Sequence, residues 1–144
     1  MKDLDIAKKN LTDNNLTLSI VKNGKLIYNS KERGVLPLYL AVTNADIATC
    51  GASVADKVTG KGAALLCAYG GIAYLHTGTM SQKAAAVLDA AEIKYSCGEL
   101  VDSIKNRAGD GSCPVEKLTG GIKDPKEAIE PIKEFLAGIG ALND

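Results

Sequence analysis

An excess of charge of either sign is missing from this 144-residue sequence, in which 17 lysines and arginines balance 17 aspartates and glutamates. Binding to nucleic acid or to an anionic membrane depends on neutralising many charges, so neither class of partner is expected. No apolar signal segment follows the first methionine, which makes a cytoplasmic location the default expectation. The length is typical of one domain, predicted to span residues 1–144.

Paired cysteines are also missing. Cys50, Cys67, Cys97 and Cys113 include no C-x-x-C pair, and His76 is the only histidine. This spacing is not typical of a zinc site, and four cysteines are too few for a disulfide scaffold. We therefore expect reduced thiols, no metal site and no cofactor.

A long uninterrupted apolar run is the third absence. The 21 residues between Lys61 and Lys83 carry no formal charge, but glycines and polar residues divide them. Each part is too short to span a bilayer, so a buried helix followed by a strand is the expected structure.

The remaining patterns predict a mixed sheet covered by helices. Asn23-Gly24, between two alternating apolar segments, predicts a β-hairpin. Ser81 is expected to cap a helix, and Pro131 is expected to kink the last one. The predicted helices span 3–10, 37–44, 53–69, 82–91, a start at Pro114, and 125–136; the strands span 16–20, 25–28, 72–76 and 93–96.

The stretch from Ser53 to Tyr69 combines charges, glycines and apolar residues. Its apolar positions recur at helical intervals and Ser53 has capping-box spacing to Asp56, which together predict one helix. In the alternative interpretation, 54–58 is a strand and Thr59 caps a helix that starts at Gly60.

Both interpretations place glycines and lysines together. A helix containing Gly60, Gly62 and the Lys57–Lys61 like-charge pair would be destabilised, unless something packs on the glycines and something negative lies near the lysines. An anionic ligand would satisfy this, as would an internal carboxylate from Asp110 or Glu116. Close packing of another element on the glycines, with solvated lysines, explains the pattern equally well.

Two phosphate-binding motifs fail at defined positions. A P-loop would need glycine at Ala55 and Ser or Thr at Gly62, and a dinucleotide fingerprint would need glycine at Leu65. Cys113 beside Glu116 could form an activated thiolate at a helix start, although capping and packing are the more ordinary roles of such a residue. His76 is expected at a strand end, and residues 106–112 could be a lid or a connector.

Three blocks, V-A-D-K-V-T-G-K-G-A-A-L-L from Val54, N-R-A-G-D-G from Asn106 and C-P-V-E-K from Cys113, carry a family resemblance. Together they resemble a family of small bacterial proteins of unknown function, similar to a divergent branch of the cytidine deaminase-like superfamily. The resemblance implies a three-layer α/β/α fold, with a mixed sheet and an N-terminal hairpin.

In zinc deaminases the helix after the hairpin begins with a metal ligand followed by Glu, and the next helix begins with Pro-Cys-x-x-Cys. The resemblance places these starts at residues 55–57 and 79–81, where no ligand set occurs. Deamination through zinc-activated water is therefore not expected.

The leading hypothesis is a zinc-free pocket for a small anionic, nucleotide-like ligand. Its walls would be Asp56, Lys57, Gly60, Lys61 and Gly62 on one side and Thr79 to Ser81 on the other, with Asp110 to Glu116 closing over them. The alternatives are a metal-independent enzyme using Cys113 or a lysine as nucleophile, with Glu116 and Asp110 as further candidates, and an interaction module without a ligand. A homo-oligomer also stays open.

Overall fold

The computed structural model describes residues 2–105, 111 and 113–142 of the chain. In chain order the elements are α1 (Lys2–Asp13), β1 (Leu18–Lys22), β2 (Lys25–Ser30), α2 (Leu36–Thr43), β3 (Ser53–Thr59), α3 (Lys61–Tyr69), β4 (Tyr74–Ser81), α4 (Gln82–Ala90), β5 (Lys94–Val101), α5 (Pro114–Leu118), the 3₁₀ helix η1 (Pro125–Ala128) and α6 (Ile129–Gly138).

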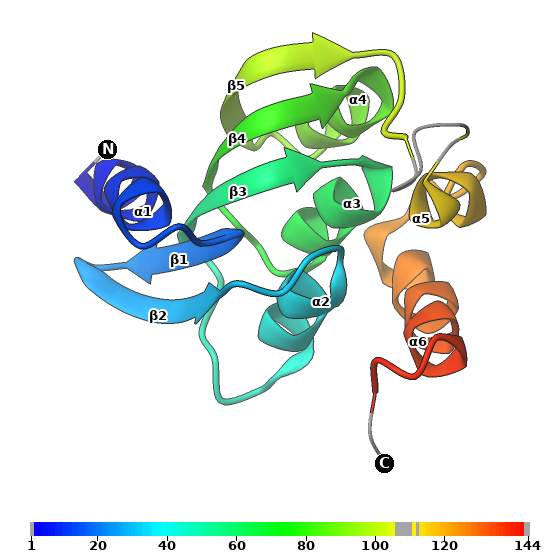
Figure 1. Cartoon of the computed structure of the whole chain (residues 1–144), viewed down its shortest axis with the longest axis horizontal. Coiled ribbons are helices and arrows are strands. Elements are labelled where there is room, and N and C mark those ends of the chain that lie inside the picture. The colour runs from blue at the N-terminus through cyan, green and yellow to red at the C-terminus, as the bar shows by residue number, and fades with distance from the viewer. Residues whose placement is uncertain (1, 106–110, 112, 143–144) are drawn as a thin grey trace.

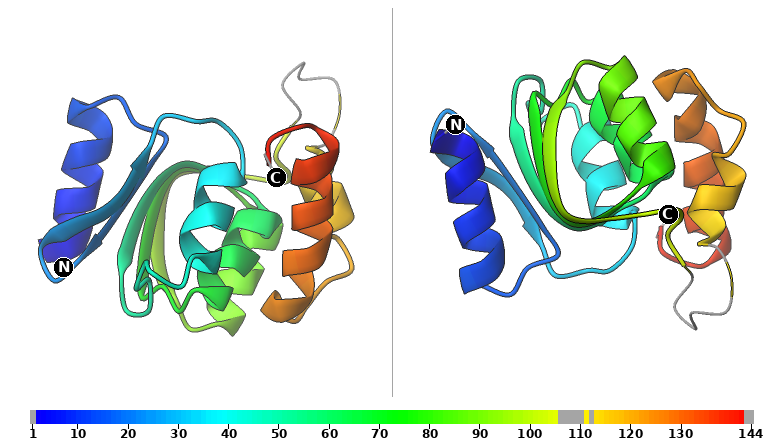
Figure 2. Two further views of the ribbon diagram at one scale, coloured as in Figure 1. Left: turned by 90° about the horizontal axis from the view of Figure 1, so that it is seen from below. Right: turned by 90° about the horizontal axis from the view of Figure 1, so that it is seen from above.

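The strands form an open, mixed, five-stranded sheet in the order β2-β1-β3-β4-β5. β1 is antiparallel to β2 and β3, whereas β3, β4 and β5 run parallel through the crossover helices α3 and α4. Figure 2 shows α1 on one face of the sheet and α2, α3 and α4 on the other. Because β3 and β4 are parallel, the starts of α3 and α4 meet at one end of the sheet.

Two apolar clusters hold these layers together. The larger lies between the sheet and α2, α3 and α4, with Val54, Leu65 and Leu75 fully buried. The smaller joins Ala7 of α1 to Ala55 in the sheet. The segment from α5 to α6 lies at the end of the sheet toward which β3, β4 and β5 point (Figure 1), and α6 adds Ile132 to the larger cluster.

The predicted hairpin is confirmed. Asn23 and Gly24 have φ angles of 53° and 78°, the left-handed pair that a tight two-residue turn requires. The carboxylate of Asp3 accepts hydrogen bonds from the backbone N–H groups of both residues, at 2.9 Å each. The start of α1 is thereby joined to the hairpin turn.

The single helix predicted from Ser53 to Tyr69 is wrong, and the alternative interpretation is the better one. Ser53 to Thr59 forms β3 at the centre of the sheet, and α3 starts at Lys61 with Gly60, not Thr59, as its N-cap. Buried Ser53 pairs with neighbouring strands instead of capping a helix. The valines and threonine of this segment favour a strand, and their spacing also matched a helical period.

A bend crosses the parallel strands and explains two glycines. A Cβ on Gly78 would lie 2.9 Å from the carbonyl oxygen of Lys57, and one on Gly98 would lie 2.9 Å from that of Gly78. Lys57 and Val58 are both exposed, whereas the next residue, Thr59, is fully buried. The alternation of buried and exposed residues therefore changes at this row, while the pairing between the strands keeps the same offset on both sides of it.

Three further predictions need correction. The strand expected at 72–76 starts later, at Tyr74, so His76 lies inside β4 and not at its end. The strand expected at 93–96 continues to Val101. Pro131 lies in the first turn of α6, where a missing N–H costs nothing, and the predicted kink is replaced by the change from η1 to α6 at Ile129. The helix at 82–90 and its Ser81 cap are confirmed, with Ser81 Oγ accepting from Ala84 N–H at 3.1 Å.

Candidate functional site

The carboxylate of Glu116 lies at the N-terminus of α3 and accepts hydrogen bonds from three separate segments. Its Oε2 accepts from the backbone N–H of Lys61 at 2.7 Å and from Ser81 Oγ at 3.0 Å. Its Oε1 accepts from the backbone N–H of Ile104 at 2.9 Å. The residue is only 3% exposed. An acidic group thus occupies the helix end that attracts negative charge.

Local sequence explains how Glu116 reaches this position. Pro114 opens α5 at a position that needs no N–H donor, which puts Glu116 in the first turn. The backbone N–H of Cys113 donates to the carbonyl of Ile104 at 2.9 Å and fixes the entry to the helix. At the far end, Lys61 Nζ donates to the carbonyl of Gly120 at 2.9 Å. Lys61 therefore contacts both ends of α5, with its backbone and with its side chain.

Gly60 and Gly62 pack against α5, at Glu116 and Val115 respectively. A Cβ on Gly60 would lie 3.1 Å from Oε2 of Glu116, and one on Gly62 would overlap the Cγ1 atom of Val115. Both glycines therefore permit the close approach of another element. The same contacts bring the Glu116 carboxylate to the N-terminus of α3. Close packing on the glycines and a nearby internal carboxylate, which the sequence offered as separate explanations, both apply here.

The structure brings together five of the residues predicted for the site: Gly60, Lys61, Gly62, Ser81 and Glu116. Lys57 is exposed on β3, and Thr79 is half-buried with its carbonyl accepting from Thr77 Oγ1 at 3.2 Å. Asp110 and most of the 106–112 loop lie outside the described residues. Ile104, whose N–H completes the donor set, was not predicted, because a backbone donor leaves no signature in the sequence.

Asp56 lies on β3, where it pairs with Leu18 of β1 on one side and with Thr77 of β4 on the other. Its Oδ1 accepts from its neighbour Lys57 N–H at 2.8 Å, and its Oδ2 accepts from Thr59 Oγ1 at 3.0 Å. Desolvation by burial raises the pKa of Asp56 to about 7, although the hydrogen bonds from Thr59 and from the backbone of Lys57 and Val58 oppose the rise. Asp56 can therefore exchange a proton near neutral pH.

The cysteines differ in their surroundings. Cys67 is fully buried in the core, as predicted, and burial raises the pKa of its thiol. Cys113 is half-buried at the N-cap of α5 and makes no side-chain capping hydrogen bond. Its role as a nucleophile stays a prediction.

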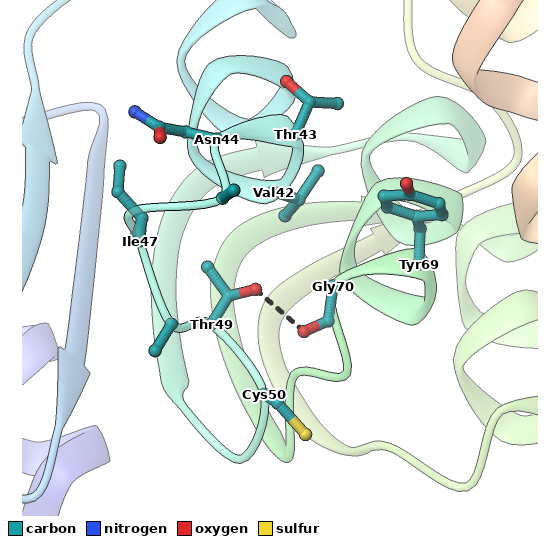
Figure 3. Close-up of a pocket in the computed structure, with 10 residues that line it drawn as sticks. Val42, Thr43, Asn44, Ile47, Thr49, Cys50, Tyr69 and Gly70 are labelled. Carbon is teal, nitrogen blue, oxygen red and sulfur yellow. Dashed lines mark hydrogen bonds between the residues drawn. The ribbon is translucent and has the colours of Figure 1, made fainter.

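A shallow groove of about 420 Å³ lies elsewhere, at the C-terminal ends of α2 and α3. Figure 3 shows Tyr69, Ile47 and Cys50 around it, with Thr49 Oγ1 donating to the carbonyl of Gly70 at 2.8 Å. The groove and the Glu116 carboxylate lie at opposite ends of α3. No sequence pattern predicts this groove, because its walls come from a connecting loop and from helix ends.

The described part of the chain has neither a metal-binding cluster nor a membrane-spanning helix. Among residues 2–105, 111 and 113–142, no three His, Cys, Asp or Glu side chains are grouped so that they could hold a metal ion. Within the same ranges, no helix has the length and apolar character needed to cross a membrane.

The fold and the site define a mixed α/β domain in which a C-terminal helix supplies a carboxylate to a crossover helix. The chain belongs to the family described as TM1506: Domain of unknown function (DUF1893), whose model matches residues 6–136. It is similar to the crystal structure, at 2.70 Å resolution, of a DUF1893 family protein (TM1506) from Thermotoga maritima. The two share 25% sequence identity and a TM-score of 0.85, over 93% of this chain and 90% of that one. A search of curated proteins found no significant match.

Proposed function

We propose that the protein binds a small anionic molecule at the N-terminus of α3, in the place that the Glu116 carboxylate takes in this structure. The observation that supports the proposal is the convergence of the Lys61 N–H, the Ile104 N–H and the Ser81 hydroxyl on one acidic group. Phosphate and carboxylate groups of metabolites present the same acceptor oxygens. Donors set at a helix N-terminus bind such groups without a metal ion.

The donors and the carboxylate belong to different parts of the chain. Lys61 N–H and Ser81 Oγ are held by the ends of two central strands, whereas Glu116 lies on a five-residue helix. Movement of α5 would expose donors that the core keeps in place. An intramolecular carboxylate competes at high effective concentration, so an external ligand must bind through more than one group. A phosphate attached to a base or sugar meets this requirement.

We also propose that the fold is of the cytidine deaminase-like type. The N-terminal hairpin, the strand order β2-β1-β3-β4-β5 and the helices on both faces support this. The helix after the hairpin is α2 and the next is α3, so on this comparison the corresponding helix starts would be Leu36 and Lys61. Residues 55–57, which the sequence resemblance gave this role, lie in β3, and residues 79–81 end β4. Neither helix start carries a histidine or cysteine, and the proposed ligand is held by backbone and hydroxyl donors.

A thermal-shift screen tests this function. Nucleotides, sugar phosphates and dicarboxylates would be added to the wild-type protein and to Glu116→Gln, with sodium chloride matched in ionic strength as the control. We expect a saturable rise in Tm with at least one phosphate compound, larger in Glu116→Gln because the internal competitor is weakened. The absence of any saturable shift in both proteins would favour an interaction module without a ligand.

A further inference from the structure

His76 and Ser96 form a hydrogen-bonded pair on the face of the sheet that carries α1. His76 Nδ1 lies 2.7 Å from Ser96 Oγ. Ala55, His76 and Ser96 are in one row across β3, β4 and β5, and Ala55 packs against α1. The row therefore faces away from α2, α3 and α4, and the pair is separate from the Glu116 site.

This pair is accessible from solvent. Ser96 is exposed and His76 is half-buried, and two positions further along each strand stand the exposed glycines 98 and 78. Alternate residues of a strand share a face, so no side chain projects at the next position of either strand. A small molecule can approach the hydroxyl from this side.

The imidazole has the protonation state that a general base needs. Desolvation by burial, followed by the positive charge of Lys8 on α1, lowers the pKa of His76 below its ordinary value. Lys94 and Tyr74 form the preceding row on the same face. The lowered pKa favours the uncharged ring, and the tautomer with its proton on Nε2 can accept the Ser96 hydroxyl proton at Nδ1. A nucleophile within hydrogen-bond reach of such a base is the arrangement used in nucleophilic catalysis.

We propose that Ser96 is a nucleophile activated by His76, and that it accepts acyl groups from small activated esters or thioesters. The Ser96 Oγ–carbon bond forms as the ester C–O or thioester C–S bond breaks. The hydroxyl proton passes to His76 Nδ1 and from there to the leaving alcohol or thiol. Lys8 and Lys94 favour acyl donors that carry negative charge. Hydrolysis of the acyl-serine repeats these steps, with water as the nucleophile and His76 again as the base.

The test uses p-nitrophenyl acetate, followed by intact mass measurement, peptide mapping and release of p-nitrophenolate. We expect one acetyl group on Ser96, none there in Ser96→Ala, and acetylation at least about tenfold slower in His76→Gln. Ser30→Ala, which changes a serine on the opposite edge strand, should react like the wild type. The rate should rise with pH to a plateau near neutrality, with a midpoint that moves upward in Lys8→Gln. Acetylation of Ser96 no faster than that of Ser30, or equal rates in wild type and His76→Gln, would overturn the proposal.

Discussion

Lys61 and Glu116 are 55 positions apart in the sequence and meet through a 2.7 Å hydrogen bond from a backbone N–H to a carboxylate oxygen. This contact joins the C-terminal segment to the first turn of a central helix. Ser81 and Ile104 donate to the same carboxylate, so one side chain links α3, α4 and the segment after β5. Both the stability and the proposed binding function depend on this junction.

Replacing Glu116 should destabilise the protein. Glu116→Gln keeps an acceptor but turns an amide N–H₂ toward one of the three donors, and Glu116→Ala leaves all three without a partner. We expect losses of about 1–3 kcal/mol in the free energy of unfolding for Gln, and more for Ala, measured by urea denaturation. Glu134→Gln on the exposed side of α6 is the matched control and should change the stability little. Equal stabilities for the Glu116 and Glu134 variants would show that the hydrogen bonds to Glu116 do not stabilise the protein.

Gly62→Ala should also destabilise, although alanine is the better helix former. The new methyl group would overlap Val115, and overpacking of this kind costs about 1–3 kcal/mol. The double variant Gly62→Ala with Val115→Ala should recover part of the loss in a double-mutant cycle. Gly121→Ala, where a Cβ meets no atom within 4 Å, is the control and should be close to neutral.

Gly78 and Gly98, where the backbones of the parallel strands approach closely, should not tolerate a side chain. An alanine at Gly78 or Gly98 would place its Cβ 2.9 Å from a backbone carbonyl oxygen, which cannot move as a flexible side chain can. We expect losses of roughly 1–3 kcal/mol for each substitution, seen as a lower denaturation midpoint. Gly138→Ala near the end of α6 has open space around it and should be neutral or slightly stabilising. A neutral result at both strand positions would contradict the described approach of the three backbones.

Asp56 should make stability depend on pH. Its folded-state pKa of about 7 lies above the ordinary value of 3.8, so the folded protein holds the proton more tightly than the unfolded chain. This contribution to the free energy of unfolding is fully present below about pH 4 and is lost as the pH rises to about 7. Asp56→Asn keeps an uncharged partner for Thr59. It should reduce the dependence of the free energy of unfolding on pH, measured by urea denaturation at a series of pH values. Asp46→Asn on an exposed loop should leave it unchanged. Parallel curves for the wild type and Asp56→Asn would contradict the account.

Much of the fold could be predicted from local signals. Asn23-Gly24 permits the left-handed angles of a hairpin turn. Ser81 marks a helix start because its hydroxyl accepts from a backbone N–H three residues later, and Pro114 marks one because the first helical position needs no N–H donor. The segment from Ser53 to Thr59 was harder, because Val54 and Val58 fit a helix and a strand alike. Its pairing with Leu18 to Val21 and with β4 decided the outcome, and those partners are distant in sequence.

The sequence identified several residues of the candidate site but not how they are arranged. The sequence indicated glycines that admit an approaching group and named Glu116 as one carboxylate that could fill the place. It carried no information on Ile104, whose contribution is a backbone N–H, or on Lys57, which the strand turns outward. The pairing of Ser96 with His76 was not predicted. It depends on the register between β4 and β5, which the sequence does not reveal.

Anion binding at the N-terminus of α3 can be measured by a titration followed by the backbone N–H signals of Lys61 and Ile104 in ¹⁵N-labelled protein. The best phosphate compound from the thermal screen, or inorganic phosphate if none stands out, would be added to the wild type and to Glu116→Gln at constant ionic strength. We expect saturable shifts of both signals, with tighter binding in Glu116→Gln than in the wild type. Signals that do not move in either protein, or that shift without saturation, would show that the α3 N-terminus serves only to hold Glu116.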